Sequence, residues 1–185
     1  MNLVKYFWGM RAIAYRIRFE KIGRLSYIGS PILLKGTKSI VIGNRVRIYP
    51  GVRMETHGKK GRIVIKDNVA ISQNFHITSF GSDLIIGENT TIGGNVFITN
   101  IDHDYRQIGV HILKQDYIEK ETRIGDNCFI GYGAAIQAGT ILGKQCVVGA
   151  NAVVRGVFPD YSVLVGAPAK VVKRYNLDSE EWEIK

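Results

Sequence analysis

An aliphatic residue returns at every sixth position along the C-terminal half of the chain. The run is Ile124, Ile130, Ile136, Leu142, Val148 and Val154. A period of six fits neither an α-helix, which repeats at about 3.6 residues, nor a plain strand, which repeats at about two. The pattern is therefore an internal repeat, and it predicts short strands joined by tight corners and wound into a coil that stacks on itself.

The same register recurs upstream, with interruptions. Its members form three sets: Ile42, Ile48 and Met54, then Ile65, Ile71 and Ile77, then Ile86, Ile92 and Ile98. Three six-residue units complete one turn of a triangular prism, and the aliphatic side chains point inward onto the equivalent residue one coil away. The spacing predicts repeats from about residue 28 to residue 160, with parallel strands about 4.8 Å apart.

Corners between these strands require backbone at positive φ, which Gly and Asn tolerate and β-branched residues do not. The expected corners are Gly43-Asn44, Glu88-Asn89, Gly94-Asn95 and Asp126-Asn127. The 21 glycines of the chain suit such a corner-rich coil.

One interruption is longer than the others. The unit that ends at Ile98 is followed in register only at Ile124, which leaves residues 101–120 as a loop thrown out from the coil. Long loops in a compact domain are often functional. This loop opens with Asp102, His103, Asp104 and Tyr105. His103 is therefore expected near the point where this loop leaves the coil.

The net charge of +9 is uneven along the chain. The first forty residues hold eight basic residues against Glu20, mixed with aromatic and aliphatic residues in an expected helix. Residues 1–20 can therefore contact an anionic membrane surface, cap the open end of the prism, or do both. Nucleic acid is not expected as a partner, because no basic groove motif with interleaved aromatic residues accompanies the charge.

Location and metal content follow from what the sequence lacks. It has no run of eighteen apolar residues, and Arg11 interrupts the apolar start, so we expect a cytoplasmic protein without a secretory signal. Cys128 and Cys146 lie one coil apart and are expected to be reduced core residues. We expect no metal site, because the histidine spacing matches no known metal-binding pattern.

Taken together, the hexads, the arm that begins with a histidine and the ending Val165-Gly166-Ala167-Pro168-Ala169-Lys170 resemble the hexapeptide-repeat acyltransferases. The resemblance is nearest to the sugar and polysaccharide O-acetyltransferase branch. It implies an all-β, left-handed parallel β-helix that assembles as a homotrimer. We expect a basic, aromatic helical segment over residues 1–27, the acyltransferase domain over 28–175 with loop 101–120, and a tail over 176–185 with a short C-terminal helix.

The resemblance also implies roles for individual residues. His103 occupies the place of the family's catalytic base, which takes the proton of a sugar hydroxyl as that oxygen attacks a thioester. The backbone near Tyr132 matches the donor to the tetrahedral oxyanion. Asn74, Asp102 and Tyr105 match acceptor contacts, and either Asp102 or Asp104 is a candidate to orient the histidine. Asn74 has the alternative role of a corner residue at positive φ.

Acetyl-CoA is the implied co-substrate, lying along the outside of the coils between neighbouring subunits. The matched positions are Phe129, Tyr132, Ala150 and Arg155, with Lys170 and Lys173 near the phosphates. Lysines there are point charges rather than bidentate forks, so the chain departs from family members that carry arginines.

The expected reaction moves an acetyl group from acetyl-CoA to a hydroxyl of a sugar in a cell-surface polysaccharide precursor. The basic, aromatic N-terminal segment favours this acceptor over a free small sugar, because it suits an enzyme held at the inner membrane surface. N-acyl transfer to an amino sugar or sugar nucleotide is the enzymatic alternative. A non-catalytic β-helix scaffold is the alternative from a different class of protein.

Overall fold

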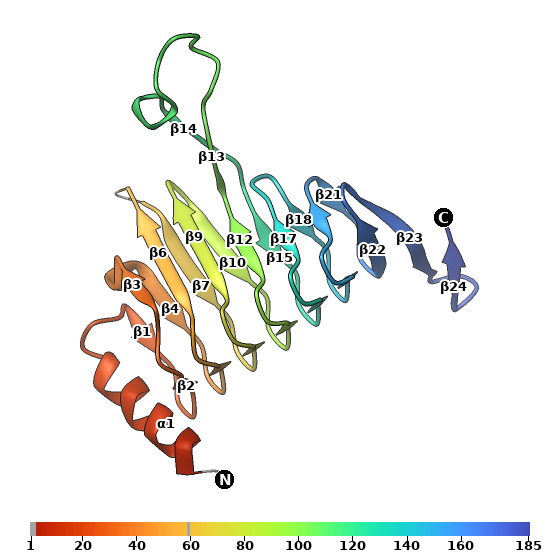
Figure 1. Cartoon of the computed structure of the whole chain (residues 1–185). Helices are drawn as coiled ribbons and strands as arrows, with labels where there is room; N and C mark the ends of the chain where they lie inside the picture. The colour runs from red at the N-terminus through yellow and green to blue at the C-terminus, as the bar shows by residue number, and fades with distance from the viewer. Residues whose placement is uncertain (1–2, 59) are drawn as a thin grey trace.

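The computed structural model describes residues 3–58 and 60–185 as a parallel β-solenoid with one protruding arm (Figure 1). In this part of the chain, three sheets form the sides of a triangular prism, which we call faces A, B and C. Face A contains β1 (Lys21–Ile22), β4 (Ile40–Ile42), β7 (Arg62–Ile65), β10 (Asp83–Ile86), β15 (Arg123–Ile124), β18 (Ile141–Leu142) and β21 (Val157–Phe158).

Faces B and C continue each coil in turn. Face B contains β2 (Tyr27–Ile28), β5 (Arg47–Ile48), β8 (Ala70–Ile71), β11 (Thr91–Ile92), β16 (Phe129–Ile130), β19 (Val147–Val148), β22 (Ser162–Gly166), β23 (Ala169–Asn176) and β24 (Glu181–Ile184). Face C contains β3 (Leu33–Lys35), β6 (Arg53–His57), β9 (His76–Phe80), β12 (Phe97–Thr99), β17 (Ala135–Ile136) and β20 (Val153–Val154). A short 3-10 helix, η1 (Thr37–Ser39), connects β3 to β4.

The six-residue register is confirmed as the core. On face A, Ile42 pairs with Ile65, Ile65 with Ile86, and Ile86 with Ile124, each one coil above the last. These side chains, like the equivalent ones on faces B and C, are at most 1% exposed. The solenoid begins earlier than residue 28, because Ile22 already stacks in register on Ile42 and Ile28 on Ile48.

The corners follow the expected chemistry at most positions. Asn89, Asn95 and Asn127 adopt φ of 57°, 58° and 58°. The second coil differs: there the residue at positive φ is Arg45 (φ 55°), one position after the expected Gly43-Asn44. Asn44 instead extends its side chain to the carboxylate of Asp67 on the neighbouring corner, at 3.0 Å.

The interruption after β12 is an arm, as expected, and it carries secondary structure of its own. β13 (Ile101–His103) pairs antiparallel with β14 (Tyr117–Glu119), and η2 (Ile112–Lys114) lies near the tip. Asn100, fully buried at the root, accepts a hydrogen bond from the Phe80 amide at 2.8 Å and donates to the Phe80 carbonyl at 3.1 Å. The arm therefore leaves the coil from a fixed point while β10 and β15 stay paired beneath it.

Helix α1 (Leu3–Tyr15) covers the N-terminal end of the solenoid (Figure 1). Ala12 is 1% exposed and Phe19, just after the helix, 3%, and both belong to the core. Trp8 packs on Tyr27 and Tyr49 at ring distances of 5.8 and 5.5 Å. The expectation that this segment caps the prism is confirmed. No helix in the described ranges is long and apolar enough to span a membrane.

The C-terminal end contradicts the expected short helix. β23 returns antiparallel along β22, and β24 pairs with β23, so strands continue to Ile184. Without β23, β22 would be the edge of face B and its outer backbone groups would be unpaired, which an added strand satisfies and a helix would not. Tyr175 and Trp182 hold the two strands together at a ring distance of 5.5 Å. Residues 176–185 are therefore part of the sheet rather than a separate tail.

The inward register predicts a sharp difference between neighbouring isoleucines on β10. Ile86 is fully buried, whereas Ile85 points outward and is half-buried. We expect Ile86→Ala to lower the free energy of unfolding by about 2–5 kcal/mol, because it leaves a cavity in the stack. Urea unfolding measures this loss, and Ile85→Ala, the matched control, should lose much less. Equal losses for the two variants would contradict the inward stack.

Candidate active site

His103 lies at the root of the arm, on an exposed strand. It is paired with Tyr117 across the β13–β14 hairpin, and the two rings lie 4.9 Å apart at 59°. Its side chain is exposed. A histidine held by a strand on one side and open to solvent on the other can receive a substrate hydroxyl without rearrangement of the backbone.

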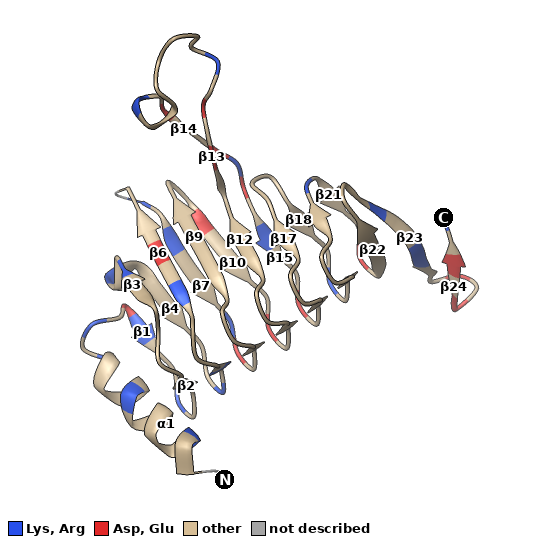
Figure 2. Cartoon of the chain, in the orientation of Figure 1, with Lys and Arg blue, Asp and Glu red and all other residues tan. Residues whose placement is uncertain are grey.

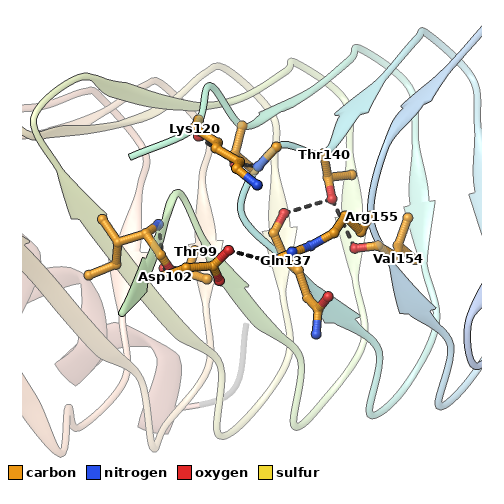
Figure 3. A network of polar contacts seen from close by, with 10 residues as sticks. Thr99, Asp102, Lys120, Gln137, Thr140, Val154 and Arg155 are labelled. Carbon is orange, nitrogen blue, oxygen red and sulfur yellow. Dashed lines mark hydrogen bonds and ion pairs between the residues drawn. The ribbon is translucent and has the colours of Figure 1, made fainter. Parts of the chain in front are cut away.

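Asp102, the neighbour of His103, forms an ion pair with Arg155. Arg155 follows β20, so this contact joins the arm to the corner between faces C and A two coils further along (Figure 3). The corner itself is tied together, since the Thr140 hydroxyl lies 2.7 Å from the Gln137 carbonyl and 2.9 Å from the Val154 carbonyl. Asp102 was expected to contact the acceptor and Arg155 the cofactor. Instead the two side chains form an ion pair that connects the arm to the solenoid.

The second acid considered as an orienting group for His103 has another partner. Asp104 accepts hydrogen bonds from Arg106 Nε at 2.8 Å and Nη2 at 2.5 Å. The hydrogen bonds from the Arg106 side chain and backbone hold the pKa of Asp104 well below its usual range. Its carboxylate is therefore charged and engaged within the arm. Tyr105, between the two, is 71% exposed.

Three further expected residues lie on a different edge of the prism, the corner between faces B and C. Asn74 sits there at φ 57°, which agrees with its alternative role as a corner residue. The Tyr132 hydroxyl meets the side-chain amide of Asn95 one coil below, and the Tyr132 carbonyl accepts from the Asn151 amide at 2.8 Å. Ala150 belongs to that next corner, and Phe129 lies nearby on face B, 49% exposed.

Close stacking at this edge explains its glycines. A Cβ added at Gly93 would lie 2.7 Å from the Tyr132 amide nitrogen, and one at Gly131 would lie 2.6 Å from the Ala150 nitrogen. Only glycine fits there. The resulting edge presents flat backbone, with aromatic side chains standing on it at Phe129 and Tyr132.

The expected residues thus fall on two edges. The arm with His103, Asp102 and Arg155 stands at the corner between faces C and A, and Asn74, Tyr132 and Ala150 lie at the corner between faces B and C. Lys170 and Lys173 form a third group, exposed on β23 near the C-terminal end.

One group of polar residues was missed by sequence reasoning. Arg53, Glu55, His57 and His76 meet on the outer surface of face C. Their common signal is weak, because they occupy outward positions of adjacent strands and only the register of β6 against β9 brings them together.

Comparisons with known proteins identify the family. Residues 121–155 match the model described as the hexapeptide repeat of succinyl-transferase. Over 160 residues the chain is 34% identical to a putative lipopolysaccharide biosynthesis O-acetyltransferase of Escherichia coli, covering 83% of this chain and 81% of that protein. The chain belongs to the hexapeptide-repeat acyltransferases.

A second member of the family, a probable acetyltransferase of Mycobacterium tuberculosis, is 33% identical over 182 residues. The match covers 91% of this chain but 59% of that longer protein. Two solved structures share the fold. A Bacillus cereus N-acyltransferase in complex with dTDP and coenzyme A superposes with a TM-score of 0.72 at 18% identity, covering 90% of each chain. A galactoside acetyltransferase in complex with coenzyme A superposes at 0.62 and 18%, covering 100% of this chain and 89% of that one.

The ion pair between Asp102 and Arg155 leads to a prediction for this acyltransferase. We expect Asp102→Asn to raise amide hydrogen exchange in residues 101–119 by roughly two- to fivefold, since an exposed ion pair contributes about 0.5–1 kcal/mol. Mass-spectrometric exchange measures this, and the core strands should not change.

A matched control and a reciprocal variant complete the test. Asp83→Asn removes a different exposed carboxylate, which faces Arg62 at 3.4 Å on face A, and should leave the arm unchanged. The exchanged pair Asp102→Arg with Arg155→Asp should restore slow exchange. If it exchanges as fast as the single variants, the arm is not held by this contact.

Proposed function

We propose that this protein transfers an acetyl group from acetyl-CoA to a hydroxyl of a sugar in a cell-surface polysaccharide precursor, with His103 as the general base. The observation that carries the proposal is an exposed histidine fixed at the root of the arm in a member of this acyltransferase family. The relative from Escherichia coli, named for lipopolysaccharide biosynthesis, supports the class of acceptor.

The chemistry assigned to His103 is proton transfer. A sugar hydroxyl is a poor nucleophile near neutral pH, so the imidazole accepts its proton while the oxygen attacks the thioester carbonyl. The tetrahedral oxyanion then collapses, the carbon–sulfur bond breaks, and the thiolate of coenzyme A takes the proton from the imidazolium. A backbone N–H near Tyr132 is the donor we assign to the oxyanion.

We assign acetyl-CoA to the edge that carries Tyr132 and Ala150, beside Phe129. Flat backbone between aromatic side chains suits the narrow pantetheine arm, and Lys170 and Lys173 supply charge for the phosphates. Arg155, matched to the cofactor on sequence, is assigned to holding the arm because Asp102 already engages it.

We propose a homotrimer, which the separation of these groups supports. The base and the edge assigned to acetyl-CoA lie on different corners of one chain, with face C between them. A threefold arrangement can set the arm of one copy beside the cofactor edge of the next and so complete three equivalent sites. The exposed Phe129 and Tyr132, 49% and 52% accessible, give this edge apolar surface for such an interface.

The N-terminal end supports an acceptor at a membrane. Helix α1 and the turn after it present one apolar stripe, with Phe7 55%, Ile13 62% and Ile17 81% exposed. Basic residues lie along α1 and in the segment after it, whereas Asp178, Glu180, Glu181 and Glu183 lie in and before β24 at the opposite end, and the other acidic residues are spread over the strands, corners and arm between them (Figure 2). Each Lys or Arg near an anionic surface adds about 1 kcal/mol of attraction.

His103→Ala tests the base. We expect it to lower the rate of acetyl transfer by roughly a hundredfold or more, the usual share of general-base catalysis. Release of free thiol from acetyl-CoA is the readout, screened across sugars, amino sugars, sugar nucleotides and lipid-linked glycans.

Light scattering should report a trimer for the wild-type protein and for His103→Ala. The control variant His111→Asn, on the same arm, should keep nearly full turnover. A His103→Ala protein with the wild-type rate would remove this residue from the mechanism. A preference for amino sugars would favour N-acyl transfer, and failure to bind coenzyme A would favour a scaffold.

The membrane proposal is tested without deleting the helix, because Ala12 and Phe19 belong to the core. We expect the wild-type protein to bind phosphatidylglycerol vesicles weakly, to release them at high salt and to ignore phosphatidylcholine vesicles. Phe7→Ser with Ile13→Ser should abolish this binding in a flotation assay. Leu177→Ser is the control, because it removes an exposed apolar side chain at the acidic C-terminal end. Wild-type protein that ignores anionic vesicles would contradict the proposal.

A further inference from the structure

A buried carboxylate lies on the outer surface of face C, outside the groups assigned to catalysis. Glu55 is 7% exposed and accepts a hydrogen bond from Arg53 Nε at 2.5 Å. The Nε2 atoms of His57 and His76 lie 3.4 and 3.5 Å from its two oxygens. We call Arg53, Glu55, His57 and His76 the Glu55 cluster.

The Glu55 cluster keeps hydrogen-bonding capacity unused. A carboxylate offers about four acceptor positions, and only the Arg53 bond here is short. In both histidines the Nε2 atom is the one nearest the carboxylate. The Nε2 atom of His76 also lies 3.1 Å from the Thr78 hydroxyl oxygen. Burying a charge is costly unless it is well paired, so a partly satisfied carboxylate at the surface is suited to a polar ligand.

The ionisation of the cluster suits a neutral ligand. Burial alone would raise the pKa of Glu55, but the hydrogen bond and charge of Arg53, with the two imidazoles, bring it below its ordinary value. Burial lowers the pKa of His76, and the charge of Arg53 lowers it further. At neutral pH the cluster therefore offers a charged acceptor beside a neutral imidazole. Lys35, Arg62, Asp83, Asp102 and Glu119 are the other charged residues on strands that pair with or contact those of the cluster, and His103 is a further titratable residue there.

Aromatic rings continue from the cluster toward His103. His76 packs on Phe97 at 5.0 Å, and His57 is paired in register with Phe80 on the next strand. Phe80 contacts Tyr117 of the arm at 5.1 Å, and Tyr117 contacts His103 at 4.9 Å. Ring contacts therefore run from Phe80 through Tyr117 to His103, and the register of β6 against β9 places His57 beside Phe80 at the start of this row.

We propose that this outer surface binds the acceptor glycan, with the Glu55 cluster holding hydroxyl groups of the sugar unit next to the one that is acetylated. The proposal rests on the function proposed above and adds the acceptor's location. A carboxylate and imidazoles accept and donate hydrogen bonds to adjacent hydroxyls, and ring faces cover the apolar C–H surface of a sugar. A flat strand face suits an extended polymer better than a closed pocket would. The anionic phosphates of acetyl-CoA do not suit a surface centred on a carboxylate.

Glu55→Gln tests the proposal, because it keeps the size of the side chain and removes its charge. In the wild-type protein, binding of methyl hexosides and of a purified bacterial polysaccharide is measured by saturation-transfer NMR, without turnover. We expect Glu55→Gln to weaken glycan binding about tenfold or more, the usual effect of losing a hydrogen bond to a charged group. The apparent KM for glycan should rise equally, while the KM for acetyl-CoA stays near wild type.

Glu88→Gln is the matched control, because it makes the same change from carboxylate to carboxamide at an exposed residue on the corner between faces A and B. It should leave glycan binding unchanged. Thermal unfolding checks that Glu55→Gln is folded. The inference is overturned if the wild-type protein binds no glycan, if Glu55→Gln binds as tightly, or if both KM values rise together. Glycan that binds without being acetylated, and that Glu55→Gln loses, would sink the proposed function while leaving the binding surface in place.

Discussion

The stacking of one aliphatic side chain directly on the next, at strand spacing, is the constraint on which the rest of this structure depends. A parallel ladder with no slip requires that each coil repeat the one before it, so every corner must turn in the same few residues. That requirement places Asn and Gly at positive φ, and it brings backbone so close at Gly93 and Gly131 that a Cβ would collide. Both edges that carry candidate site residues are products of this spacing.

Much of the fold could be predicted because the inward positions repeat along the sequence itself. The differences fall where the period breaks or ends. The solenoid begins before residue 28, since Ile22 and Ile28 keep the six-residue spacing, but their partners Ile42 and Ile48 lie 20 residues later rather than 18, which breaks the period between the first two coils. The C-terminal helix expected alongside the family resemblance is replaced by β23 and β24, because the deciding factor is the edge that β22 would otherwise expose, which is a tertiary feature.

The candidate site divides in the same way. His103 could be predicted because it stands where the period breaks, and a break can be read from the sequence. The partnership of Asp102 with Arg155 could not, since those residues are 53 positions apart and meet only because the solenoid brings the corner after β20 near the root of the arm. The Glu55 cluster was missed for a related reason. Outward residues of a solenoid are free to vary, so their meaning appears only once adjacent strands are placed in register.

The arm also has a consequence for how the chain folds. Before the arm, neighbouring corners that contact each other are separated by 20 to 24 residues, and after it by 16 to 19. Across the arm the separation rises to 38, between Thr90 and Cys128. Because loop-closure entropy grows only with the logarithm of length, this near-doubling costs about 0.6 kcal/mol. The growing solenoid therefore meets a single small entropic step, after the fourth coil, and nucleation on either side of the arm can proceed before the two halves join.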